Sequence, residues 1–164
     1  MGFVSEPLAE HHDLEHFDSG RPELDTWLQR HALASEARRT GRTFVWRRDE
    51  RVVAYYTIAA HLLVRADLPS KLGRGNPTQV PAVMLARLAL DKSLHRQGHG
   101  GTLLADALYR IVAATHTVAA RFVLVDAIDE VAHGFYRHYG FRAIPGSLRL
   151  VQKISDVAAA LDAP

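Results

Sequence analysis

The sequence predicts an α/β (α+β) domain built on a mixed central sheet. β-branched and aromatic runs that are typical of strands alternate with segments whose apolar residues have the three-and-four spacing of a helix. Their order is a helix, then a meander of strands, then a β-α-β-α-β-β series, which indicates a layered domain with a mixed sheet. The 164 residues, 48% of them hydrophobic, suit one domain with one core, residues 1–164.

An amphipathic helix is expected first. It begins near Pro22, because proline suits the first helical position, with Ser19 or Gly20 just before it as the cap. Its apolar stripe comprises Leu24, Trp27, Leu28 and His31.

Two strands follow, joined by a turn at Asp49-Glu50. The run RTFVWRR, residues 42–48, is rich in β-branched and aromatic residues, and VVAYYTIAAHLLV, residues 52–64, is apolar throughout, which is typical of an interior strand. Tyr55 and Tyr56 point to opposite faces of the second strand, so we expect one in the core and the other at a cleft.

The middle of the chain holds the longest expected loop, DLPSKLGRGNPTQVP, residues 67–81, because Gly, Pro and polar residues dominate it. Its length indicates a functional role or mobility. The next segment, AVMLARLALD, residues 82–91, is a strand candidate, although its Leu and Ala content also fits a helix.

The second half is expected to alternate helix and strand. Residues 100–115 form a helix with one broad apolar face, RFVLVDA is a buried strand, and DEVAHGFYRHYG is a short helix closed by Gly140. The remainder pairs as strands around Pro145-Gly146, and the tail, residues 155–164, is either a short helix or disordered.

Composition excludes several classes of protein. The chain has no cysteine, so it forms neither a disulfide framework nor a thiolate metal site, and its ten histidines show no HExxH spacing; we expect no metal. No apolar run reaches the roughly 18 residues of a membrane span, and the polar N-terminus is unlike a signal peptide. We therefore expect a cytoplasmic protein with no membrane partner. The net charge of +2 permits a polyanionic partner without requiring one.

The most specific stretch is LHRQGHGGTLL, residues 94–104, at an expected strand-to-helix junction. It places three glycines, Gly98, Gly100 and Gly101, beside a cation. A helix N-terminus carries about half a positive charge and unpaired N–H groups, and glycines let an anion approach them. A plain turn is the alternative, but this density of glycine favours a phosphate site. The spacing fits neither a Walker motif nor a Rossmann fingerprint.

This stretch resembles the acetyl-CoA motif of the GCN5-related N-acetyltransferases (GNAT), Gln/Arg-x-x-Gly-x-Gly/Ala. Gly98 and Gly100 occupy the two small positions. The first position is His95 instead of Gln or Arg, which leaves open whether His95 or Arg96 contacts the pyrophosphate. A second family signature, Asn-x-x-Ala-x-x-x-Tyr-x-x-x-Gly-Phe, is present with Asp in place of Asn. It is carried by Asp129, Ala132, Tyr136, Gly140 and Phe141.

The resemblance implies the GNAT fold, a mixed and mostly antiparallel central sheet flanked by helices, and acetyl-CoA as cosubstrate. It implies that the strand around Ala89 bonds the pantetheine arm and that the turn cradles the pyrophosphate. The implied cofactor-binding residues are Leu88, Ala89, Leu90, His95, Arg96, Gln97, Gly98, His99, Gly100, Gly101, Thr102, Asp129, Phe135 and Tyr139.

Tyr136 falls on the position of the family's catalytic tyrosine, which implies that it donates a proton to the leaving thiolate as general acid. The alternative is a core aromatic residue packed beside Phe135 and Tyr139, and it is the motif position that favours catalysis.

The N-terminal half resembles one branch of the family, the acetyltransferase toxins of bacterial toxin–antitoxin modules. The resemblance lies in FDSGRPELDTWLQRHALASEARRTGRTFVW, residues 17–46, and in the run from Pro81 to Asp91. It implies acetylation of the α-amino group of aminoacyl-tRNA, a block of translation, a ribbon-helix-helix antitoxin as partner, and a homodimer.

A tRNA acceptor accounts for the arginines of this half as phosphate contacts. Arg87 lies inside an expected strand, so it either holds the acceptor strand or active site, or pairs with Asp91 or Asp126. For any single arginine a solvated basic face is the alternative. The residues expected to bind tRNA are Arg38, Arg39, Arg42, Arg74 and Arg87.

Two other functions compete with the toxin. One is a GNAT acetyltransferase of a small amine or a protein N-terminus, which an acidic acceptor pocket would favour. The other is a non-catalytic nucleic-acid-binding module; the glycine turn and Tyr136 count against it, and no helix-turn-helix or zinc spacing is present.

Overall fold

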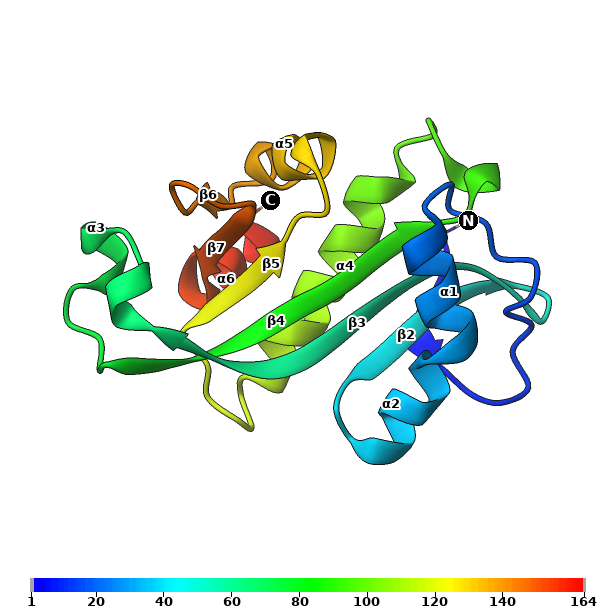
Figure 1. Cartoon of the computed structure of the whole chain (residues 1–164), viewed down its shortest axis with the longest axis horizontal. Helices are drawn as coiled ribbons and strands as arrows, with labels where there is room; N and C mark the ends of the chain where they lie inside the picture. The colour runs from blue at the N-terminus through cyan, green and yellow to red at the C-terminus, as the bar shows by residue number, and fades with distance from the viewer. Residues whose placement is uncertain (1, 164) are drawn as a thin grey trace. The chain divides into compact units, whose positions relative to one another are not determined.

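The computed structural model describes residues 2–163 and consists of strands and helices in the order shown in Figure 1. The strands are β1 (Glu6–Pro7), β2 (Arg42–Arg48), β3 (Arg51–Val64), β4 (Gln79–Leu90), β5 (Phe122–Asp126), β6 (Arg142–Ala143) and β7 (Arg149–Lys153). The α-helices are α1 (Pro22–Arg30), α2 (Ala32–Arg38), α3 (Ser70–Gly73), α4 (His99–Ala114), α5 (Glu130–His138) and α6 (Ile154–Asp162). Two short 3-10 helices are η1 (Arg65–Asp67) and η2 (Lys92–Leu94).

The strands form one mixed sheet in the order β1-β2-β3-β4-β5-β7-β6. β1 pairs with β2, β2 with β3, β5 with β7 and β6 with β7, all antiparallel, whereas β4 and β5 are parallel. Parallel neighbours need a crossover, and α4 lies between β4 and β5 in the chain. The predicted α/β class with a mixed sheet is therefore confirmed.

The chain divides into two compact units. The first comprises the residues up to Ala59 together with Ala86–Ala107, and the second comprises Ala60–Leu85 and the residues from Leu108 onward. β3, β4 and α4 each contribute residues to both units.

In the first unit, α1 and α2 lie together over β2 and β3 (Figure 1). The apolar stripe of the two helices packs against one face of these strands. This core comprises Leu8, Leu14, Phe17, Leu28, Ala32, Val45, Val52, Tyr55 and Ala89. Because successive strand residues point to opposite faces, Trp46 and Tyr56 face away from this core, toward α4.

Asp106 of α4 joins three segments of the first unit. Its carboxylate accepts hydrogen bonds from Tyr56 Oη at 2.7 Å, from Trp46 Nε1 at 3.1 Å and from Ser5 Oγ at 2.7 Å. Phe3 stacks on the Trp46 ring with 5.0 Å between centroids. The N-terminal segment, β2, β3 and α4 are thus tied at one carboxylate.

The second unit has its own apolar core, formed by β3, β4, β5 and β7 with the segment that contains α3. It comprises Leu63, Leu68, Leu72, Val80, Ala82, Phe122, Leu124 and Val151, with Met84 and Ile144 packed against it. β5 contributes Phe122 and Leu124 to this core.

Several expectations at the element boundaries are corrected. The first helix begins at Pro22 as predicted, but Arg21 occupies the cap position, and Ser19 instead donates to the Asp25 carboxylate at 2.6 Å. The loop expected over residues 67–81 contains η1 and α3 and ends where β4 begins at Gln79. Two further ambiguous segments are now assigned: residues 82–91 are largely strand, and the tail contains helix α6.

The expectation that one of the two tyrosines of β3 lies at a cleft is also corrected. Both are fully buried, so neither lines a cleft. Tyr55 donates its hydroxyl proton to the Leu24 carbonyl at 2.7 Å, and Tyr56 donates to Asp106. Sequence alternation gives opposite faces correctly, but it does not show that helices cover both faces.

Replacing Asp106 with alanine should lower the free energy of unfolding by about 2–4 kcal/mol, because Trp46 and Tyr56 lose their acceptor while remaining buried. Tyr56→Phe removes one of these bonds without leaving a donor unpaired, and should cost only about 1 kcal/mol. Urea unfolding followed by circular dichroism measures both. Equal losses for the two variants would contradict the central role of the carboxylate.

Candidate functional site

The glycine turn lies between η2 and α4 in the first unit, and its backbone requires glycine at one position. Gly98 has φ +80°, in the left-handed region, and a Cβ built there would meet nothing within 4 Å. Arg96 has φ +60°. Two left-handed residues on either side of Gln97 make the chain turn sharply just before α4 begins at His99, one residue earlier than predicted. The side of Gly98 that a side chain would fill is open.

The backbone before the turn is held by side-chain hydrogen bonds. The carboxylate of Asp91, which is buried, accepts from the backbone N–H of Ser93 at 3.0 Å and from its hydroxyl at 2.7 Å, which caps η2. His95 Nε2 donates to the Leu90 carbonyl at 2.9 Å, and Gln97 Nε2 donates to the Ser93 carbonyl at 2.9 Å. His95 is thus engaged by its own chain, which leaves Arg96 as the cation at the exposed side of the turn.

The first turn of α4 is suited to bind an anion. The helix is 16 residues long and has no acidic residue in its first turn. Gln97, Gly98 and Thr102 are exposed. His99 differs, because its ring packs edge-on against Phe3 at 5.9 Å and Trp46 at 6.3 Å, so its side chain anchors the helix start to the core. Among these predicted residues, His99 therefore offers its backbone and not its ring.

The strand segment predicted to bind the pantetheine arm is the C-terminal end of β4. Ala89 is buried in the core of the first unit, whereas Leu88 and Leu90 are half-buried. Arg87, Leu88, Ala89 and Leu90 and the turn residues all belong to the first unit, so the structure brings this part of the predicted set together.

The other predicted residues, Asp129, Phe135, Tyr136 and Tyr139, belong to the second unit and lie on or next to α5. Asp129 Oδ1 accepts from the backbone N–H of Ala132 at 2.9 Å, so this residue caps the helix. The helix ends as predicted near Gly140, which has φ +95° and follows the C-cap residue Tyr139. The second motif therefore has a structural role at both ends of α5.

Tyr136 is the buried aromatic residue of α5. Its side chain is 6% exposed and packs edge-on against Phe135 at 5.2 Å and Phe141 at 5.6 Å. Burial raises the pKa of the Tyr136 hydroxyl above its usual value, and a tyrosine is protonated at neutral pH with either value. Phe135 also contacts Tyr139 edge-on at 5.1 Å. The ring is part of an aromatic cluster, and the hydroxyl is a neutral proton donor.

The predicted tRNA-binding arginines differ in environment. Arg38 and Arg39, at the end of α2, are exposed. Arg42 is exposed but pairs with Glu36 at 2.8 Å. Arg87 is half-buried, and its guanidinium carbon lies 3.9 Å from the centroid of the Trp27 ring. The structure therefore places one of the five in a packed setting.

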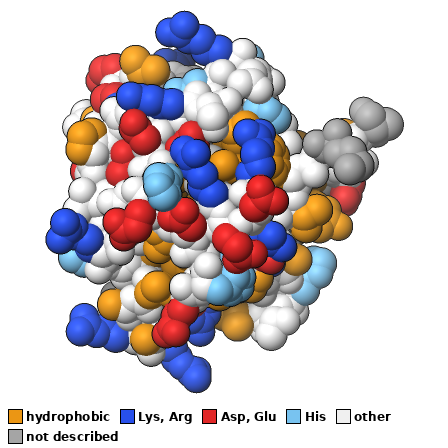
Figure 2. Space-filling model, turned by 90° about the vertical axis from the view of Figure 1, so that its right-hand side faces the viewer, with side chains coloured by type: hydrophobic (Ala, Val, Ile, Leu, Met, Phe, Trp, Pro, Cys, Tyr) orange, Lys and Arg blue, Asp and Glu red, His pale blue; other side chains and the backbone are white. Residues whose placement is uncertain are grey.

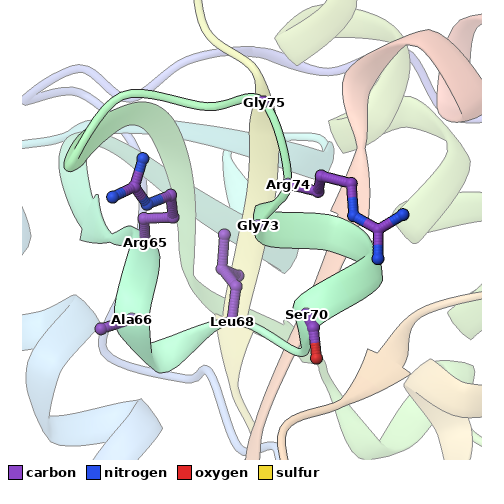
Figure 3. Close-up of a pocket in the computed structure, with 7 residues that line it drawn as sticks. All are labelled: Arg65, Ala66, Leu68, Ser70, Gly73, Arg74 and Gly75. Carbon is purple, nitrogen blue, oxygen red and sulfur yellow. The ribbon is translucent and has the colours of Figure 1, made fainter.

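Arg74 lines a pocket of about 410 Å³ in the second unit, together with Arg65 (Figure 3). Arg65 donates to the Asn76 carbonyl at 2.7 Å, which holds the loop closed. Arg74 was expected as a contact and Arg65 was not singled out from the basic half of the chain, because nothing local indicates that the two line one pocket. The lining residues are Arg65, Ala66, Leu68, Ser70, Gly73, Arg74 and Gly75.

A second cavity of about 560 Å³ in the same unit was not predicted as a site. Arg149 binds the Asp126 carboxylate in a bidentate manner, at 2.7 and 2.9 Å, and this pair lowers the pKa of Asp126. His61 belongs to the same unit, and burial lowers its pKa. The position of Asp126, at the end of a buried strand, was the available signal. The lining residues are Asp67, Asp126, Ile144, Pro145, Ser147, Leu148 and Arg149.

The described residues contain no cluster of His, Cys, Asp or Glu side chains that could hold a metal ion. Within residues 2–163, no helix is both long and apolar enough to cross a membrane. The face that Figure 2 draws carries basic and acidic side chains interspersed, so it presents no broad field of one sign.

Comparison with known proteins extends these observations to the whole chain. The model of the acetyltransferase (GNAT) family matches residues 7–141. A tRNA-acetylating toxin of Mycobacterium tuberculosis (strain ATCC 25618 / H37Rv) is 37% identical over 153 residues, which are 93% of this chain and 92% of the relative.

Two solved structures share the fold closely. The structure of AtaT complexed with acetyl-methionyl-tRNAfMet has a TM-score of 0.88 and 28% identity, and the match covers 97% of this chain and 99% of that one. A mutant of the AtaT toxin bound to the C-terminus of the antitoxin AtaR and to acetyl-CoA has a TM-score of 0.84 and 27% identity, covering 98% and 99%. The range of the family match, residues 7–141, spans parts of both units.

Proposed function

Because the chain belongs to the GNAT family of acetyltransferases and, within it, to the toxin acetyltransferases, we propose that it transfers the acetyl group of acetyl-CoA to the α-amino group of aminoacyl-tRNA and so blocks translation. The observation that carries the proposal most is the match to tRNA-acetylating toxins over nearly the full length of both chains. A non-catalytic nucleic-acid-binding role is wrong, since the chain is an acetyltransferase. Aminoacyl-tRNA also implies action in the cytoplasm.

Acetyl-CoA is the cosubstrate and supplies the acetyl group as a thioester. We propose that the exposed N–H groups at the start of α4 and the Arg96 guanidinium bind its pyrophosphate, with Gly98 leaving the approach open. His95 is the weaker candidate because its ring already donates to the Leu90 carbonyl. The β4 segment from Leu88 to Leu90 would hold the pantetheine arm through its backbone.

We propose Tyr136 as the general acid. The amine nitrogen forms the amide bond as the C–S bond breaks, Tyr136 donates its proton to the sulfur, and the proton that the amine loses restores the hydroxyl through solvent. Tyr136 is protonated before the reaction starts, because even the usual pKa of tyrosine lies well above neutral pH and burial raises it further. Burial disfavours a free thiolate as well as a phenolate, so the proton transfer must accompany C–S cleavage.

The acceptor amine requires little activation. A free α-amino group titrates near 7.7–8.0, so a useful fraction is neutral at cytoplasmic pH. The protein therefore contributes mainly by orienting the amine and the thioester.

We propose Arg38, Arg39 and Arg74 as phosphate contacts for tRNA, because all three are exposed and carry donors toward solvent. Arg65 lines the same pocket as Arg74 (Figure 3). Arg42 is expected to contribute less, because its guanidinium is already paired with Glu36.

A second candidate function, acetylation of a small amine, is favoured by one observation. The cavity of about 560 Å³ is lined by two carboxylates, Asp67 and Asp126, which suit a cationic amine. Asp126 is neutralised by Arg149, however, so the acidic character of this cavity is reduced.

We also propose that the chain forms a homodimer and that a ribbon-helix-helix antitoxin binds it. The dimer is supported by exposed apolar side chains on β3, where Leu62 is 58% and Val64 45% exposed on either side of buried Leu63. An antitoxin is supported by the AtaT structure bound to the AtaR C-terminus.

Tyr136→Phe should lower the turnover of aminoacyl-tRNA acetylation at least about 100-fold, because it removes only the proton donor. Mass spectrometry of charged bulk tRNA, incubated with the protein and acetyl-CoA, detects acetylated aminoacyl-adenosine and identifies the preferred amino acid. Acetyl-CoA affinity should stay within about twofold. Transfer at the parent rate would refute the acid role, and transfer to added small amines alone would favour the second candidate function.

Gly98→Ala should weaken acetyl-CoA binding about tenfold or more, because alanine disfavours φ +80° and fills the open side of the turn. Gly146→Ala is the matched control, since Gly146 has φ +78° and equally open surroundings. Both variants should lose about 1 kcal/mol of stability, but only the first should lose affinity in calorimetry. Equal affinities would remove the turn from the cofactor site.

Leu62→Arg should convert the dimer to a monomer, because a charge cannot be buried in an apolar contact. Light scattering at several protein concentrations measures the mass. A parent protein that is monomeric at every concentration would contradict the dimer.

Failure of a co-expressed ribbon-helix-helix partner to co-purify and to restore growth would contradict the proposed antitoxin.

A further inference from the structure

Arg87 is a half-buried cation in the first unit to which no described residue supplies a carboxylate. The carboxylates expected to pair with it are engaged elsewhere: Asp91 binds Ser93 and the backbone N–H of Asp18, and Asp126 binds Arg149. Burial lowers the pKa of Arg87 from its usual value, although the group stays charged. Partial burial of a cation without an ion pair costs hydration, so Arg87 is a candidate for a functional contact.

The guanidinium is held by stacking. Its central carbon lies 3.9 Å from the centroid of the Trp27 ring, and Trp27 is stacked in turn on Tyr55, with 6.2 Å between centroids and 12° between planes. Tyr55 is fully buried and its hydroxyl is fixed to the Leu24 carbonyl. The guanidinium and the two stacked rings, from β4, α1 and β3, therefore form one column with the cation at its end.

The contact with Trp27 limits which N–H donors of Arg87 are available to an anion. A guanidinium lying against a ring has one face covered, and its N–H donors project from the edge in a fixed fork. This fork matches two oxygens of a carboxylate or a phosphodiester, whereas lysine would present only a point charge.

The position of Arg87 in the chain favours a phosphodiester over a carboxylate. This step rests on the proposed function. Arg87 directly precedes Leu88, the first residue of the β4 segment assigned to the pantetheine arm. With the pantetheine arm on that segment, an anion bound at Arg87 belongs to the acceptor near its reacting amine. Every aminoacyl-tRNA carries the phosphodiesters of its 3′-terminal nucleotides there, whereas a carboxylate is present only with aspartate or glutamate.

We propose that Arg87, held flat by Trp27, binds the phosphodiester that precedes the 3′-terminal adenosine of aminoacyl-tRNA and so positions the aminoacyl ester. It is a positioning contact of one defined phosphate. The exposed arginines Arg38, Arg39 and Arg74 differ from it, because they act through charge alone and are screened by salt.

The test compares two acceptors that differ by that phosphate, an aminoacyl-CpA dinucleotide and an aminoacyl-adenosine. Arg87→Gln should lower kcat/KM for the dinucleotide about 10- to 100-fold, through KM, and change the value for the nucleoside less than about twofold. Trp27→Leu keeps the charge but frees the guanidinium, and should produce the same selective loss, about 3- to 10-fold. Arg121→Gln, an exposed arginine, is the control and should change neither value.

Equal losses on both acceptors, or no loss on either, would overturn the proposal. Arg87→Lys guards against a folding defect: it preserves the charge, and it should recover only part of the dinucleotide activity because the fork is lost. Full recovery would overturn the bidentate contact. Failure of the proposed function is distinguishable, because the parent protein would then acetylate neither acceptor nor charged tRNA.

Discussion

The carboxylate of Asp106 is the contact on which the first unit depends. It receives hydrogen bonds from the N-terminal segment, β2 and β3, through Ser5, Trp46 and Tyr56. A helix is stiff along its axis, so α4, fixed at about its second turn, has a fixed direction at its first. His99 completes this by packing on Trp46. The hydrogen bonds that Asp106 accepts, about two turns further along the helix, therefore set the direction of the N–H groups proposed to bind pyrophosphate.

The glycine turn proposed to bind pyrophosphate and the tyrosine proposed as general acid differ in solvent exposure. The turn at Gly98 is exposed, and its value lies in backbone N–H groups that remain free to bind an anion. The side chain of Tyr136 is buried among aromatic rings, and burial raises the pKa of its hydroxyl. A buried turn, by contrast, would carry unpaired donors at high cost.

The arginines show that a sequence reveals charge but does not reveal the environment of each charged side chain. Arg38, Arg39, Arg42 and Arg74 were expected as one basic set, and Arg87 was set apart because it lies inside an expected strand. The structure divides these arginines further: Arg38 is exposed, Arg42 is paired with Glu36, and Arg87 is stacked on Trp27. Trp27 is distant from Arg87 in the chain, so only the packing of α1 on the sheet reveals the pair. The charge itself was predictable, but the role each charge can play was not.

The sequence by itself determined the α/β class, most of the strand and helix order and the glycine turn, because these follow from local periodicity and backbone preference. The position of Tyr136 in its motif came from the resemblance to the family. Tertiary structure alone decided the burial of both Tyr55 and Tyr56, the short helices inside the expected loop, and the pocket that joins Arg65 to Arg74. The physical reason is the range of the interactions. Backbone conformation depends on a few neighbouring residues, whereas burial and pairing depend on which distant segments cover a side chain.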